Sequence, residues 1–170
     1  CFPFTHQPRS KHAFPRIQDN HRLIAFIGHL GAYSGGTSGG YSSAPSENDC
    51  AACHRSFPVN SGTAGFAISS APTLVGASNL AVQVDFSNSS MARHGFELAV
   101  RDATNSASGS WTITSASTTR MGSANHVVQT STGAGQQGWS VDWVAPANLP
   151  AGPVTFHSSG VQGNGSGTSG

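Results

Sequence analysis

Charged side chains are scarce in this sequence. Asp, Glu, Lys and Arg make up 9 % of its 170 residues, and the formal net charge is +1. A nucleic-acid surface needs clustered Lys and Arg side chains that follow the phosphate backbone, and no such cluster occurs. Because the chain contains seven acidic residues in total, paired catalytic carboxylates have few candidates. We therefore expect no nucleic-acid partner and no enzymatic activity.

Long apolar runs and cysteines are also rare. A membrane helix needs about 20 consecutive apolar residues, whereas the best candidate, LIAFIGHLGAY at 23–33, is short and is interrupted by His29. The three cysteines are Cys1, Cys50 and Cys53, and an odd number argues against a simple disulfide framework. We expect neither a membrane span nor a disulfide scaffold.

Residues 1–36 differ in composition from the rest of the chain. They contain four of the eight histidines, namely His6, His12, His21 and His29. Basic residues, a short apolar run and small residues follow one another here, which is the order of a secretory signal peptide. The histidine inside the apolar run counts against cleavage. This region is therefore either a signal-like segment or an ordered N-terminal arm.

The remainder of the chain divides into a linker with a cysteine motif, at 37–62, and a region of β pattern, at 63–170. Apolar and polar residues alternate with period two at 80–86, 95–100, 111–115, 139–143 and 154–156, and more weakly at 65–70 and 126–130. This alternation is typical of strands with one buried face. Turn-rich pieces separate the segments, and no long helical pattern occurs. The sequence predicts an all-β, antiparallel Ig-like sandwich of about seven strands.

The stretch DCAACHRSF, at 49–57, contains the spacing C-x-x-C-H. Covalent haem needs two thiols to meet the two vinyl groups of the porphyrin and a histidine that binds the iron. A zinc site would need two more ligands, a thioredoxin-like pair would need a βαβ pattern, and a tight disulfide leaves the histidine unexplained. We therefore predict one haem c, attached through Cys50 and Cys53, with His54 as the proximal iron ligand.

The residues themselves leave the sixth iron ligand open. The candidates are the histidines of the N-terminal region together with Met91, His94, Met121, His126 and His157. His126 begins a strand candidate, in which it shares a face with Val128 and Thr130. For any one of these side chains, a role in packing or at the surface is the more common use.

Several segments resemble exported bacterial proteins of the choice-of-anchor V type. These segments are GYSSAPSENDCAACH at 40–54, RHGFELAVRDA at 93–103, NHVVQTSTG at 125–133 and the stretch at 139–170. The second half of the chain is also distantly similar to the reeler domain, a β-sandwich of extracellular proteins. The resemblance covers about residues 37–170, and it implies an exported, reeler-like sandwich preceded by a haem-attachment segment.

The resemblance also bears on individual residues. It implies haem attachment at Cys50 and Cys53 and iron ligation by His54. It makes His126 the first choice for the distal ligand, ahead of Met121, Met91 and His94. The family pattern continues into a further strand that this sequence does not reach, so the sandwich is expected to lack its last strand. An open sheet edge invites strand addition, which would build a homo-oligomer or a filament.

The sequence thus predicts an exported c-type cytochrome with one covalent haem. It would transfer electrons to redox partner proteins in the periplasm or outside the cell, alone or as a subunit of a larger assembly. The alternative is a non-enzymatic extracellular β-sandwich that acts as a binding or structural module, in which haem is absent or incidental.

Overall fold

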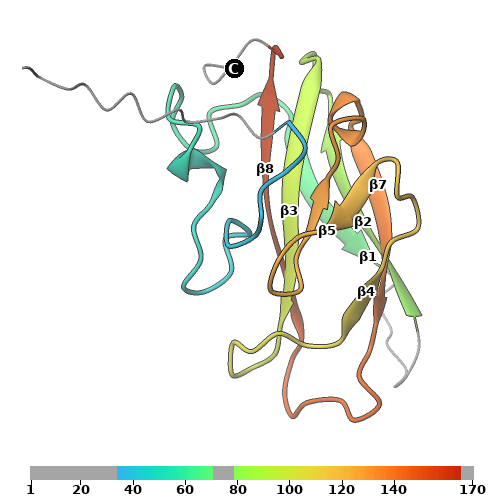
Figure 1. Cartoon of the computed structure of the whole chain (residues 1–170). Coiled ribbons are helices and arrows are strands. Elements are labelled where there is room, and N and C mark those ends of the chain that lie inside the picture. Colours follow the sequence, from blue (N-terminus) through green and yellow to red (C-terminus); the bar gives the residue numbers. More distant parts are fainter. Residues whose placement is uncertain (1–33, 71–78, 166–170) are drawn as a thin grey trace, which may run out of the picture.

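The computed structural model describes residues 34–70 and 79–165, which form two antiparallel four-stranded sheets (Figure 1). The strands are β1 (Gly65–Ser70), β2 (Asn79–Ser87), β3 (Arg93–Arg101), β4 (Ser110–Thr112), β5 (Thr119–Met121), β6 (Val127–Gln129), β7 (Gly138–Val144) and β8 (Thr155–Gly163). Two short 3-10 helices, η1 (Cys50–Ala52) and η2 (Gly133–Gly135), complete the described elements. The predicted antiparallel β-sandwich is confirmed, with β5 as a strand that the sequence pattern did not indicate.

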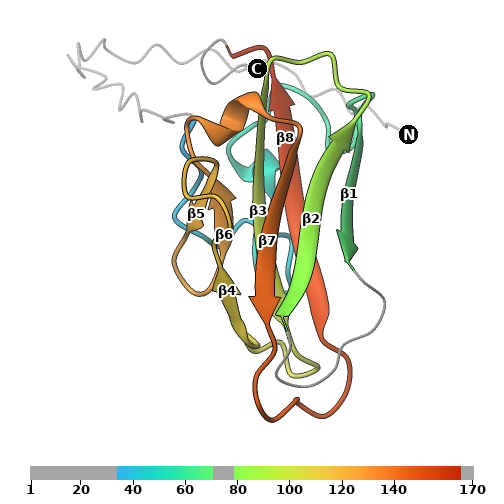
Figure 2. The same cartoon turned by 90° about the vertical axis from the view of Figure 1, so that its right-hand side faces the viewer.

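The two sheets face each other with strand orders β1-β2-β7-β4 and β5-β6-β3-β8 (Figure 2). The prediction of a signal-like segment or arm at 1–36 falls almost wholly outside the described residues. Within 34–70 and 79–165, no helix is long and apolar enough to cross a membrane.

The core lies between the sheets, where alternating side chains from both inner faces meet. In β2 and β7, buried and more exposed residues alternate along the strands, as the sequence predicts. Trp143 is fully buried, its ring stands edge-on to Phe156 at a centroid distance of 5.4 Å, and its indole N–H donates to the Ser108 carbonyl over 2.9 Å. Because a buried Trp needs a partner for its N–H group, this bond satisfies the polar atom of Trp143, which is the fully buried Trp of the core.

β3 differs from the predicted pattern, because it is buried on both faces. Phe96, Leu98 and Val100 point into the core, as expected. Glu97, which the alternation assigns to the solvent face, is only 1 % exposed, and Arg101 at the end of the strand is 7 % exposed. The expectation of one buried face is therefore wrong for this strand.

A segment of chain before the sandwich covers this outer face. We call residues 34–54 the cover segment; it passes over β3 and beside β8 (Figure 1). Gly36 lies so close to β6 that an added Cβ would be 2.7 Å from the Cβ of Val128, and its φ of +80° also favours glycine. The Tyr41 amide donates to Glu97 over 2.7 Å. The sandwich thus carries a third, irregular layer on one side.

β8 is an edge strand of its sheet. Among the described strands it pairs with β3 alone. The Ser159 side chain of β8 contacts the cover segment through Tyr41 and Cys50. The further strand that the resemblance implies would follow residue 165, so strand addition at this edge stays a prediction.

Leu98 and Leu149 offer a matched test of the core. Leu98 is fully buried between the sheets, whereas Leu149 is 45 % exposed in the loop between β7 and β8. Leu98→Ala should lower the free energy of unfolding by about 2–5 kcal/mol, because it removes buried methyl groups and leaves a cavity. Leu149→Ala should change it by less than about 0.5 kcal/mol. Urea unfolding of both variants measures these values, and equal effects would contradict this placement of the core.

Candidate functional site

Four titratable or charged side chains meet between the cover segment and the outer face of β3. Glu47 comes from the cover segment, Glu97 and Arg101 from β3, and His126 immediately precedes β6. The carboxylate of Glu47 lies 3.0 Å from His126 Nε2 and accepts a hydrogen bond from the Arg101 guanidinium. Glu97 Oε1 lies 3.5 Å from the same nitrogen. We call these four residues the charge cluster.

The cover segment supplies most of the other hydrogen bonds to the two carboxylates. Glu97 accepts from the Thr37 hydroxyl and from the Tyr41 amide. Glu47 accepts from the Ser42 hydroxyl over 2.6 Å, and Ser42 is itself fully buried. Since buried carboxylates are stable only when they are paired and hydrogen-bonded, the cluster ties the cover segment to the sandwich.

The bonds around Glu47 set its acidity. Burial by itself would raise the pKa of Glu47, but hydrogen bonds from Ser42, His126 and Arg101 and the charge of His126 lower it to about 2 from 4.5. The carboxylate is therefore charged at any pH near neutrality, as an ion-pair partner must be.

The same cluster contains the atoms of a conceivable metal site. Ligand atoms of Glu47, Glu97 and His126 lie within 4.8 Å of one another. The Arg101 guanidinium, however, already binds the carboxylate of Glu47 and lies 3.3 Å from His126 Nε2. Because this cation supplies the positive charge that a metal ion would bring, we interpret the cluster as an ion-pair network.

His126, the first choice for a distal haem ligand, lies inside this network. It is 1 % exposed, and its Nδ1–H donates to the Ser123 carbonyl over 2.7 Å. Its Nε2 faces Glu47, Glu97 and Arg101. Both ring nitrogens therefore have protein partners.

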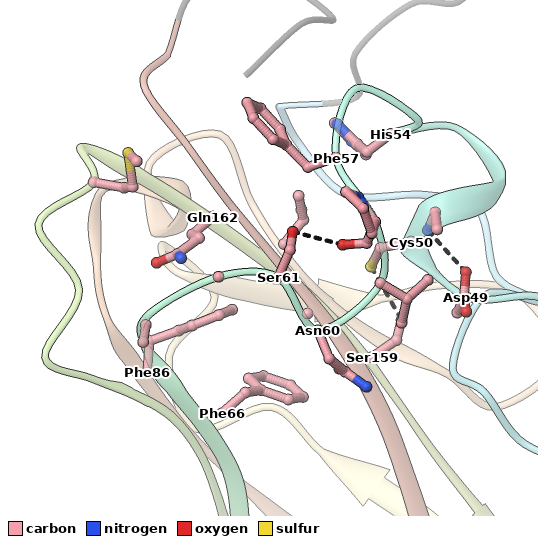
Figure 3. A pocket seen from close by; sticks show the side chains of 18 of the residues that line it. Asp49, Cys50, His54, Phe57, Asn60, Ser61, Phe66, Phe86, Ser159 and Gln162 are labelled. Atoms are coloured by element: carbon pink, nitrogen blue, oxygen red, sulfur yellow. Dashed lines mark hydrogen bonds between the residues drawn. The ribbon is translucent and has the colours of Figure 1, made fainter.

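The cysteine motif forms a compact turn at the end of the cover segment. The Asp49 carboxylate accepts from the Ala51 amide over 2.8 Å and so caps η1 at its N-terminus. The amides of Cys53 and His54 both donate to the Cys50 carbonyl, over 3.3 and 2.9 Å. These bonds hold the turn in place, and the dashed line at Asp49 in Figure 3 marks the first of them.

The Cys50 thiol is the donor in its hydrogen bond to β8. Its sulfur lies 3.0 Å from Ser159 Oγ. The Ser159 hydroxyl donates its one proton to the Tyr41 carbonyl, so the thiol must donate to Ser159. Burial, as the largest cause, raises the pKa of Cys50 to about 11, and nearby Glu97 and Asp49 act in the same direction. This thiol is therefore protonated at neutral pH.

A hollow of about 560 Å³ opens beside the motif, between the edge strands β1 and β8 (Figure 3). Phe66 and Phe86 line it from the sandwich side, with their ring centroids 4.8 Å apart. Gly160 of β8 makes room for these rings, because an added Cβ would lie 2.5 Å from the ring of Phe66. Phe57 and Val59, in the loop that leads to β1, also line the hollow.

A second hollow, of about 50 Å³, lies between the motif and the sheet. Cys50, Cys53 and His54 all line it, together with Gly95 and Val161 of the sheet. A space of this size holds a few water molecules at most. The larger hollow is lined by Cys50 and His54 but not by Cys53. Within the described residues, the two thiols thus share the small hollow alone, and that hollow is too small for a porphyrin.

The remaining candidates for the distal ligand are scattered. The histidines of the N-terminal region lie outside the described residues. Among the described candidates, Met91 is the one that lines the larger hollow together with Cys50 and His54. Met121 is 40 % exposed on β5. His94 is buried against Phe86, and burial lowers its pKa. His157 lies on β8, where burial, followed by the charge of Arg101, lowers its pKa.

The sequence reasoning missed the charge cluster. The alternation at 95–100 predicts that Glu97 faces solvent and does not reach Arg101, and Glu47 falls in the predicted linker. The sequence nevertheless contains a signal, because Glu97 and Arg101 are an acid and a base on one face of an otherwise apolar strand. If that face is covered, these two side chains need partners.

Acid titration tests the role of Glu47. Its pKa is about 2 in the folded protein and 4.5 as the ordinary value, so its contribution to stability is present above pH 4.5 and is lost as the pH falls toward 2. This contribution is at most about 3 kcal/mol. We expect Glu47→Gln to be less stable at pH 7 and to have a flatter stability profile over this range.

The measurement is urea unfolding at a series of pH values from 2 to 6. Asp85→Asn, which removes an exposed carboxylate on β2, is the matched control and should keep the slope of the wild type. Parallel profiles for the wild type and Glu47→Gln would show that Glu47 is not held as an ion-pair partner.

Comparison with known proteins gives one family match. Residues 50–165 match the model of the Reeler domain. A similar solved structure is the crystal structure of the Reelin-N domain of F-spondin, with 22 % sequence identity and a TM-score of 0.49, covering 58 % of this chain and 73 % of that one. No curated protein matches the chain.

The family match corrects the prediction of a cytochrome. Reeler domains are non-enzymatic β-sandwich modules of extracellular proteins, so the identification as a haem-carrying electron-transfer protein is wrong. The extracellular, non-enzymatic alternative is supported instead, as is the reeler-like part of the resemblance. The choice-of-anchor V part stays a prediction. Since the match spans more than half of the sequence, the chain belongs to the Reeler domain family.

Proposed function

We propose that this chain is an exported binding module that holds an apolar group of a partner in the hollow between β1 and β8. Export from a bacterial cell is supported by the signal-like order of residues 1–36 and by the resemblance to secreted bacterial proteins. Binding is supported by the surface around the hollow, which is the observation that carries the proposal.

Exposed apolar side chains gather at this hollow. Among the described residues, five large hydrophobic side chains are exposed: Phe57, Val59, Met91, Met121 and Leu149. The first three, at 65 %, 60 % and 42 % exposure, all line the hollow. Single exposed apolar residues are ordinary, whereas a cluster beside a concavity is typical of a binding surface.

The hollow combines this apolar rim with a few polar groups. Gln162 lies at its wall and accepts from the Ser89 hydroxyl over 2.7 Å. Asn60 and Ser61 lie on the loop that crosses the opening, where the Ser61 hydroxyl donates to the Pro58 carbonyl (Figure 3). Apolar walls with a small number of oriented polar groups are the usual composition of a ligand pocket.

The loop that carries Phe57 and Val59 is anchored at both ends. It begins at η1, which the hydrogen bond between Cys50 and Ser159 joins to β8, and it ends in β1, which pairs along its length with β2. A surface held in place before binding loses less conformational entropy when a partner arrives. The arrangement therefore favours a preformed site.

A fluorescent apolar probe tests this proposal. We expect 1-anilinonaphthalene-8-sulfonate to bind the folded wild type, and Phe57→Ser to reduce the fluorescence gain several-fold. The substituted side chain is 65 % exposed, so the variant should keep its stability. Leu149→Ser, which removes an exposed apolar side chain in the distant β7–β8 loop, is the matched control and should bind like the wild type. Equal fluorescence from all three proteins would refute the assignment of the site.

An absorption spectrum tests the correction independently. The purified protein, expressed with an export signal in cells that attach haem c, is expected to show no c-type bands when oxidised or reduced. If such bands appear and are lost in Cys50→Ser and Cys53→Ser, the motif attaches haem and the non-cytochrome assignment is wrong.

A further inference from the structure

We propose that Cys50 and Cys53 form a reversible disulfide within the turn of η1, so that the C-x-x-C motif is a dithiol–disulfide pair. This inference goes beyond the proposed binding function and does not depend on it. It uses the two side chains that the corrected haem prediction leaves without a role.

The backbone already brings the two cysteines to bonding distance. Cys50 begins η1, and Cys53 is its C-terminal cap with helical φ and ψ of −108° and −36°. A 3-10 helix rises about 2 Å per residue with three residues per turn, which places residues i and i+3 about 6 Å apart. A disulfide requires Cα atoms about 4.4–6.8 Å apart. The turn therefore meets the main geometric requirement without any rearrangement of the backbone.

The side chains also point to the same side. In a 3-10 helix the side chains at i and i+3 eclipse one another. In agreement, both Cys50 and Cys53 line the same small hollow of about 50 Å³. Both are thiols in this structure, and neither is fully buried. The hollow gives the sulfur atoms room to approach each other but excludes a larger group between them.

The expected compartment supplies the oxidant. Reeler domains occur in extracellular proteins, and thiols outside the cell meet disulfides of low molecular weight and of other proteins. The oxidant that we propose belongs to this chemical class, an organic disulfide RSSR, and it acts by thiol–disulfide exchange.

The two thiols have different roles in the exchange. The Cys50 thiol is protonated and donates to Ser159, so Cys53 is the first nucleophile. Its thiolate, formed by loss of a proton to solvent, attacks RSSR to give a mixed disulfide, and RS⁻ leaves and takes up a proton. Cys50 then loses its proton to solvent and attacks the sulfur of Cys53, releasing a second RS⁻. In sum, two cysteine thiols and RSSR become one protein disulfide and two RSH.

Oxidation has a local structural cost that makes it reversible. The disulfide removes the S–H donor that Cys50 offers to Ser159, whose hydroxyl still donates to the Tyr41 carbonyl. The closed loop is also very short, so it constrains the unfolded chain little and adds little to folding stability. A bond at the surface with a small stabilising effect is typical of a labile disulfide rather than of a permanent structural one.

The test uses the full chain with Cys1→Ser, so that the pair contains its only thiols. The protein is equilibrated with mixtures of reduced and oxidised glutathione, quenched with acid and alkylated with N-ethylmaleimide. We expect the intact mass to fall by two hydrogens as the oxidised fraction of glutathione rises, with no uptake of maleimide. Dithiothreitol should restore uptake of two maleimides, and peptide mapping should locate the bond between Cys50 and Cys53.

Single variants in the same background separate the two roles. Cys50→Ser should accumulate one glutathione on Cys53, because the resolving thiol is missing. Cys53→Ser should take up glutathione at least tenfold more slowly, since the remaining thiol is protonated and hydrogen-bonded to Ser159. Circular dichroism confirms that each variant is folded. Uptake of two maleimides at every glutathione ratio, or a wild-type pair carrying two glutathiones, would overturn the proposal.

Discussion

The contact between Glu47 and Arg101 is the constraint on which the rest of this structure depends. It joins an irregular stretch of chain to the outer face of β3, and His126 and Glu97 complete the network from the sandwich side. Without this contact, the guanidinium of Arg101 would be buried without its carboxylate partner, which costs far more than the pair contributes when it is intact. The cover segment and the charged face of β3 therefore require each other. Because η1 follows the cover segment directly, the same network determines where the cysteine motif lies relative to β8.

The charge cluster also determines, step by step, where the loop after η1 lies. The charge cluster fixes the cover segment, the cover segment places Cys50 against Ser159, and the loop after η1 then crosses the gap between β1 and β8. In a chain segment attached at one end only, the exposed side chains of Phe57 and Val59 would be an ordinary feature. Held at both ends, they instead form the rim of a preformed hollow, which is the property that a binding module needs. The proposed binding surface is thus a consequence of how the segment before the sandwich is attached.

The sequence predicted the sandwich well because strands with one buried face carry their pattern in consecutive residues. β2 and β7 alternate as expected, and their apolar residues meet the inner face of β3. The charge cluster could not be found in this way, since Glu47 lies 50 residues before Glu97 in the chain and only the folded cover segment brings them together. His126 was singled out for its residue type and its place in a strand. Its partners are carboxylates and a guanidinium, and only the three-dimensional structure identifies them.

The cysteine motif shows the limit of reasoning from local spacing. C-x-x-C-H fixes which side chains share one turn, and a haem, a metal ion and a disulfide can all use that arrangement. What separates these uses is the space around the turn. Here the two cysteines share with Gly95 and Val161 of the sheet a hollow that is too small for a porphyrin. Because the turn places the two sulfur atoms side by side, it favours a disulfide, which the two cysteines can form without a third partner.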